Sequence, residues 1–86
     1  MAQFYRIVME YLEEYEPEQM AALQRERQLL SYVKELADTL HSESARIAER
    51  LRDHYPEMSD EQLQIEAEDA AIAAILPIPE PEARSQ

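Results

Sequence analysis

The stretch LLSYVKELADTLHSESARIAERLRDHY, residues 29–55, decides the fold. Its apolar and small residues recur at alternating intervals of three and four, which is the spacing of one face of a helix. This seam consists of Leu30, Val33, Ala37, Leu40, Ser44, Ile47 and Leu51. We therefore expect one long helix over 29–55 that packs in a helical bundle. Because serine side chains compete locally with backbone hydrogen bonds, a kink at 41–44 remains an alternative.

Upstream, residues 2–15 have the pattern of an amphipathic helix. One face carries Phe4, Tyr5, Val8, Tyr11, Leu12 and Tyr15, and the opposite face carries Arg6, Glu10, Glu13 and Glu14. We expect the aromatic face to lie in the core, with contact to a partner protein as the alternative. Pro17 ends this helix and suits the first turn of the next, expected over 18–25. The polar run at 24–28 is then either a turn or an exposed part of a continuous helix.

Downstream, Pro56 ends the long helix, because the residue before a proline avoids the helical region. The run Ser59-Asp60-Glu61-Gln62 is a capping box, which predicts a last helix over 60–76, ended by Pro77. This helix is apolar on two sides: Leu63, Ala67, Ala70 and Ala74 on one, and Ile65, Ile72 and Leu76 on the other. Such a helix is usually packed on two sides, and the second neighbour can belong to another subunit.

The composition indicates an all-α protein. Glycine, which tight hairpins and phosphate-binding loops need, is absent, and strong helix formers dominate the 86 residues. We expect a small bundle of three to four helices in one domain over 1–76, followed by an extended or disordered tail, PIPEPEARSQ, over 77–86. A chain this short buries only about 60% of its unfolded surface, so we expect self-association to complete the bundle.

The apolar segments are too short for a membrane span. The longest uninterrupted apolar run covers residues 70–76, whereas a transmembrane helix needs roughly 20 residues. The stretch MAQFYRIVMEYLEEYE lacks the basic start and apolar core of a signal peptide. The absence of cysteine is compatible with a reducing compartment, and we expect a cytoplasmic location. We expect no membrane partner, because the acidic polar face would be repelled by anionic lipid.

The net charge of −11 is unevenly distributed. Residues 1–24 and 56–86 each carry one arginine against five and eight acidic residues, while 25–55 is balanced with six of each sign. The cluster Arg46, Arg50 and Arg52 is interleaved with acids, as in intrahelical ion pairs on a solvated face. Because nucleic-acid phosphates are bound by clustered, unneutralised basic residues, we expect no direct nucleic-acid partner.

Motifs for catalysis or metal binding are weak. Asp38 and His41 have the spacing of one carboxylate–histidine pair of a di-iron bundle, but His54 has Leu51 in the corresponding position. Ser42, near His41, fits a helix surface better than a nucleophile–base pair. We therefore predict no enzymatic activity, no catalytic residues, no metal and no cofactor.

Two functional hypotheses remain. The first is a small acidic protein–protein interaction module, an accessory, adaptor or regulatory subunit that self-associates, with a protein partner of unknown identity. Its predicted interface residues are Leu30, Val33, Leu40, Ile47, Leu51, Ile65, Ile72 and Leu76. The second is an acidic inhibitor from a phage or mobile element that imitates nucleic acid and blocks a nucleic-acid-binding protein. Acidic residues that merely keep a small protein soluble are the simpler explanation of the charge.

Overall fold

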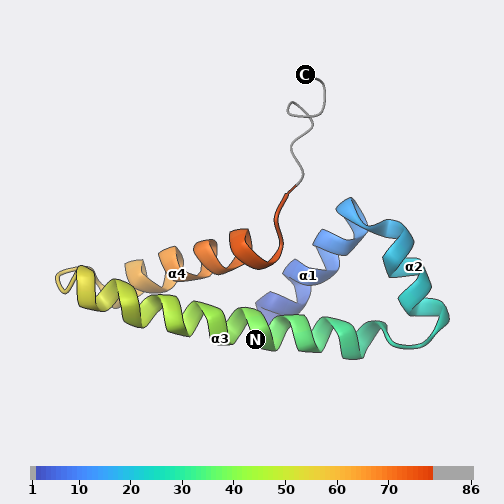
Figure 1. Ribbon diagram of the computed structural model, residues 1–86, viewed down its shortest axis with the longest axis horizontal. Coiled ribbons are helices and arrows are strands. Elements are labelled where there is room, and N and C mark those ends of the chain that lie inside the picture. Colours follow the sequence, from blue (N-terminus) through green and yellow to red (C-terminus); the bar gives the residue numbers. More distant parts are fainter. Residues whose placement is uncertain (1, 79–86) are drawn as a thin grey trace, which may run out of the picture.

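The computed structural model describes residues 2–78 and contains four helices and no strand in that range. The helices are α1 (Ala2–Tyr15), α2 (Pro17–Arg25), α3 (Leu29–His54) and α4 (Asp60–Ile75) (Figure 1). The prediction of a small all-α bundle is confirmed, and each predicted helix agrees with the observed one to within a residue at either end. Residues 79–86, most of the predicted tail, lie outside the described residues.

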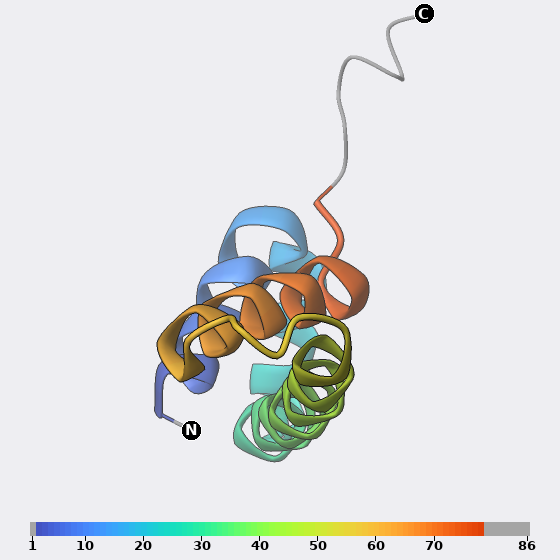
Figure 2. The ribbon, with the colours of Figure 1, turned by 90° about the vertical axis from the view of Figure 1, so that its left-hand side faces the viewer.

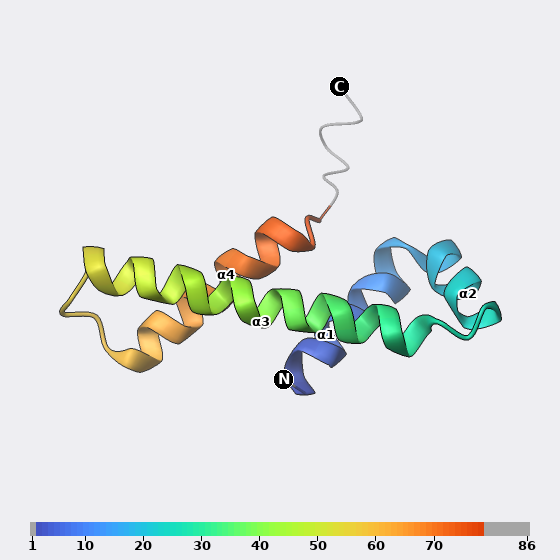
Figure 3. The same cartoon turned by 60° about the horizontal axis from the view of Figure 1, so that its bottom comes forward.

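Helix α3 is the central element and contacts each of the other three helices. Helix α4 runs back along α3 after a turn at 55–59, in which the Met58 amide donates to the Tyr55 carbonyl at 3.0 Å. In Figures 1 and 2, α1 and α4 lie on the same side of α3, and Figure 3 shows α3 in front of both. Within residues 2–78, the opposite side of α3 therefore has no helix packed over it.

The core lies where α1, α3 and the end of α4 meet. Its buried side chains are Phe4, Val8, Leu12, Met20, Val33, Ala37, Leu40, Ala71 and Leu76. Burying a large aliphatic or aromatic side chain contributes about 1.5–3 kcal/mol, so this cluster supplies most of the hydrophobic stabilisation. The aromatic face of α1 is only partly in the core, because Phe4 is buried whereas Tyr5 is exposed.

The polar run at 24–28 is a turn. Helix α2 ends at Arg25, and Arg27 takes the left-handed conformation with φ 59°. The Gln28 amide donates to the Leu23 carbonyl at 2.9 Å, and the Arg27 amide donates to the Gln24 carbonyl at 3.1 Å. These two bonds form a Schellman motif, a helix end that usually has glycine at the left-handed position.

The serine-containing stretch 41–44 does not interrupt α3, which is continuous from Leu29 to His54. Ser44 is buried, and its hydroxyl donates to the His41 carbonyl at 3.0 Å. A bond to the preceding turn satisfies the buried hydroxyl without breaking the helix.

Helix α4 begins at the predicted cap, but its buried face differs from the prediction. The Gln62 amide donates to Ser59 Oγ at 3.1 Å, while the Gln62 side chain donates to Glu66 instead of returning to the cap residue. Leu63, Ala67 and Ala71 are buried. Ala70 and Ala74, predicted on the same side as Leu63 and Ala67, are exposed. The physical reason is that the second half of α4 buries Ala71 in the core cluster shared with α1.

Candidate interaction surface

The structure divides the predicted interface residues into three groups. Val33, Leu40 and Leu76 are buried inside the chain. Ile47, Leu51 and Ile72 are half-buried. Leu30 and Ile65 are 79% and 51% exposed. A second molecule can reach the first group only if the helices separate, so Leu30 and Ile65 are the most accessible of the eight residues. That these residues form an interface stays a prediction.

An apolar hollow lies between α1 and the end of α4. We call it the α1–α4 hollow and define it by its lining residues, Ile7, Glu10, Tyr11, Glu14, Tyr15, Ile72, Leu76 and Ile78. A second hollow adjoins it, sharing Ile72, Leu76 and Ile78 and adding Asp69, Ala73 and Pro77. The two share Ile78, which is 63% exposed. Together they form an accessible, mainly apolar surface at the end of α4.

Residues far apart in the sequence are held together at this hollow by one hydrogen bond. The Tyr11 hydroxyl donates to the Pro77 carbonyl at 2.8 Å, linking α1 to the residues after α4. On α1, Ile7 and Tyr11 lie one turn apart and share a face. The Tyr11 and Tyr15 rings are 5.2 Å apart and tilted by 47°, a spacing favourable for aromatic pairs. The floor of the hollow is thus built from α1, α4 and the segment after it.

Carboxylates line both hollows. Glu10 and Glu14 come from α1, and Asp69 comes from α4. The Glu14 carboxylate raises the pKa of the Tyr15 hydroxyl. Partial burial, and then the charge of Glu16, raise the pKa of the Tyr11 hydroxyl. Among residues 2–78, no basic side chain lines either hollow, so the local potential is negative.

Two arginines of α3 form ion pairs with carboxylates outside the hollows. The Nε and Nη2 groups of Arg46 donate to the two carboxylate oxygens of Glu43, and this contact lowers the pKa of Glu43 and raises that of Arg46. Arg52 reaches Asp60 at the start of α4, at 3.5 Å. The basic cluster seen in the sequence is therefore partly neutralised by ion pairs, and one of them joins α3 to α4.

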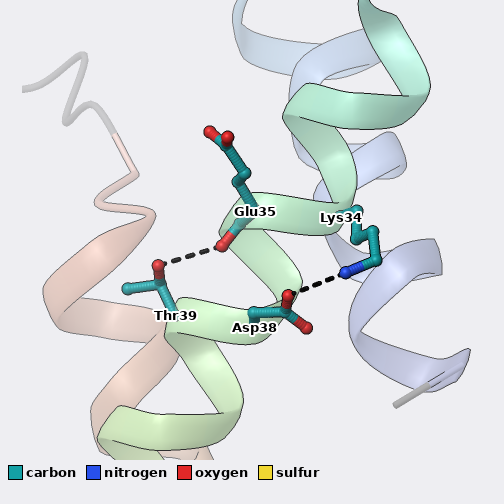
Figure 4. Close-up of polar contacts among 4 residues, drawn as sticks. All are labelled: Lys34, Glu35, Asp38 and Thr39. Carbon is teal, nitrogen blue, oxygen red and sulfur yellow. Dashed lines mark hydrogen bonds and ion pairs between the residues drawn. The ribbon is translucent and has the colours of Figure 1, made fainter.

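The carboxylate–histidine pair on α3 lies on an exposed face. Asp38 accepts a hydrogen bond from Lys34 at 3.2 Å, and Thr39 donates to the Glu35 carbonyl at 2.9 Å (Figure 4). The Asp38 hydrogen bond and charge raise the pKa of Lys34. Within residues 2–78, no three histidine, cysteine or acidic side chains are grouped so that they could hold a metal ion.

No helix within the described part of the chain is long and apolar enough to cross a membrane.

Sequence reasoning placed only part of this surface. Ile72 and Leu76 were predicted interface residues, and Tyr11 was assigned to an aromatic core face. Ile78 was assigned to the tail, because it lies between two prolines. An isoleucine in an otherwise polar, proline-rich segment is the signal that could have indicated a contact.

Comparison of the chain with family models, with curated proteins and with solved structures finds no match. The functional interpretation therefore rests on the apolar residues and the carboxylates of the hollow.

Proposed function

We propose that this chain is a non-enzymatic interaction module, an accessory or regulatory subunit that presents an apolar helical surface to another protein. The supporting observation is the contiguous apolar surface at the end of α4, where Ile72 and Ile78 line two adjoining hollows. Ile65 lies seven residues before Ile72, about 10 Å away along the same side of α4, with Glu68 and Asp69 between them. Single exposed apolar residues are ordinary, whereas contiguous apolar surface marks interaction sites.

The test is capture of partners from the native host with the wild-type chain and with an Ile65→Ser/Ile78→Ser variant. Both side chains are more than half exposed, so the variant should fold normally. We expect a partner of the wild-type chain to be lost by this variant. Tyr55→Ser, an exposed residue in the turn before α4, is the matched control and should retain the partner. Recovery of the same proteins by all three chains, or of none by the wild type, contradicts the proposal.

Self-association is a separate proposal. The segment 25–55 is balanced in charge, so two copies can approach through it without the repulsion expected between their acidic parts. Leu30, at the start of α3, is an exposed aliphatic residue on that segment. A cytoplasmic location stays a prediction.

The alternative proposal, imitation of nucleic acid, is supported by the exposed carboxylates of α4. Asp60, Glu61, Glu66 and Asp69 are exposed, and Glu68 is half-buried. If the chain is a mimic, neutralising Glu66, Glu68 and Asp69 should weaken binding of its partner and flatten the salt dependence of that binding. For an apolar contact at the hollows, neutralising Glu66 and Glu68 matters little and Ile72→Ala matters more, whereas Asp69 lines the second hollow and affects both kinds of contact. Partner capture by Glu66→Gln/Glu68→Gln and by Ile72→Ala therefore separates the two proposals.

A further inference from the structure

We infer that the α1–α4 hollow binds a cationic amphipathic segment of another protein, whose apolar side chains enter the hollow while its lysines or arginines face the surrounding carboxylates. This inference rests on the proposed interaction function and specifies the chemistry of the partner.

The apolar floor requires an apolar anchor. Ile72 and Ile78 belong to both adjoining hollows, and Ile7 extends the first of them on the α1 side. The floor is held in place by the hydrogen bond from Tyr11 to the Pro77 carbonyl. A surface ordered before binding loses less conformational entropy when a partner arrives. Aliphatic side chains spaced along one face of a helix are the usual occupants of such grooves.

The carboxylates determine the charge of the partner. Glu10 and Glu14 lie one turn apart on the α1 side of the hollow, and Asp69 of α4 lines the adjoining second hollow. An approaching segment with basic residues beside its apolar face meets opposite charge at both hollows. The paired rings of Tyr11 and Tyr15 add aromatic faces to the same hollow, and such faces attract lysine and arginine.

The other occupants that this chain could itself supply have unfavourable charge. Residues 79–86 carry Glu80 and Glu82 against Arg84. They would bring acidic groups toward Glu10 and Glu14, the carboxylates at the rim of the hollow. A second copy brings a net charge of −11. Its arginines at 46 and 52 are engaged with carboxylates of their own chain. A cationic segment from a different protein therefore fits the hollow better than either.

The test uses the whole chain and a synthetic amphipathic helix of leucine and lysine, about four turns long, titrated into isotopically labelled protein. We expect backbone amide shifts at residues 7–15 and 69–78, and little change at 29–54. A peptide of the same composition in scrambled order, and one with glutamate in place of lysine, should not produce this pattern.

Two charge variants separate the hollow from general attraction to an acidic protein. Glu10→Gln/Glu14→Gln removes two carboxylates at the rim, and Glu57→Gln/Glu61→Gln removes two exposed carboxylates near the start of α4. Both doubles change the net charge equally. The rim double should weaken peptide binding about three- to tenfold, and the control double by less than about twofold. Ile78→Ser should also weaken binding, since it removes an exposed part of the floor.

The inference is overturned if the peptide does not bind, if its shifts map outside the hollow, or if both doubles weaken it equally. Partner capture distinguishes this failure from failure of the proposed function. A native partner that is lost by Ile65→Ser but kept by Ile78→Ser and by the rim double would leave the chain an interaction module and refute the hollow as its docking site.

Discussion

Arg27 ends helix α2 with a φ of 59°, a conformation that disfavours residues with a Cβ atom. Replacing it by glycine relieves this strain, although glycine also increases the entropy of the unfolded chain. We expect Arg27→Gly to raise the free energy of unfolding by about 0.5–1 kcal/mol. Arg50→Gly, in the interior of α3, should instead lower it by about 1 kcal/mol. Urea denaturation of the two variants and the wild type measures both changes, and a lower midpoint for Arg27→Gly contradicts the expectation.

Ser59 accepts a hydrogen bond from the Gln62 amide at the start of α4. Ser59→Ala leaves that amide without its acceptor and should lower the free energy of unfolding by about 0.5–2 kcal/mol. Ser42→Ala, on the exposed face of α3, is the control and should be neutral or slightly stabilising, because alanine is the better helix former. An unchanged thermal midpoint for Ser59→Ala would show that the cap contributes nothing.

These two helix ends show why one local feature was predictable and the other was not. The Ser59 cap depends on neighbouring residues in a recognisable order, so the sequence alone located it. The end of α2 lacks the usual glycine, and its polar run at 24–28 fits an exposed helix as well as a turn. The turn follows from packing, because α2 has to contact both α1 and α3.

At the scale of the helices, the predicted seam of α3 is a packing face from Val33 to Leu51, whereas its first residue, Leu30, is exposed. Val33, Ala37 and Leu40 are buried against residues of the same chain. The alternating spacing identifies which side of a helix is buried, and it does not identify what covers that side. The face of α4 was wrong for Ala70 and Ala74, since a repeat of three and four assumes one neighbour along the whole helix.

Two leucines of α3 test this packing directly. Leu40 is fully buried, and Leu30 is 79% exposed. Leu40→Ala should lower the free energy of unfolding by about 2–5 kcal/mol, because it removes buried methyl groups and leaves a cavity. Leu30→Ala should change it by less than about 0.5 kcal/mol. Similar losses for the two variants, measured by chemical denaturation, would contradict the arrangement of α3.

We expect the contact between α1 and Pro77 to depend on pH. Tyr11→Phe removes the hydroxyl that donates to the Pro77 carbonyl, which should lower the free energy of unfolding by about 0.5–1.5 kcal/mol near neutral pH. Because burial and Glu16 raise the pKa of Tyr11, the folded state favours the neutral phenol. Its contribution is full below the unfolded pKa of about 10 and is lost as pH rises through the higher folded value. The difference in the free energy of unfolding between wild type and variant should therefore shrink at alkaline pH.

At the scale of the whole molecule, the candidate surface joins segments that the sequence does not connect. The hollow depends on α1 meeting the end of α4 across more than sixty residues, as the Tyr11–Pro77 hydrogen bond shows. Hydrophobic periodicity describes single helices and contains no information about such crossings. Ile72 and Leu76 could therefore be chosen as apolar residues of interest, but Ile7 and Ile78 could be placed beside them only in the folded chain.

Self-association is the last property to test, and the fold changes where it should occur. Most of the seam is buried within one chain, so we expect two copies to meet through the exposed start of α3 around Leu30. Analytical ultracentrifugation at micromolar concentration should give a mass above that of the monomer. Added salt should strengthen association, because it screens the repulsion between chains that each carry a net charge of −11.

Leu30→Asp should shift the protein to monomer without unfolding it, since that side chain is exposed. Ile78→Ser, at the hollow, should leave the mass unchanged. A monomer at all salt concentrations, or dissociation by Ile78→Ser in place of Leu30→Asp, would show that the start of α3 is not the contact.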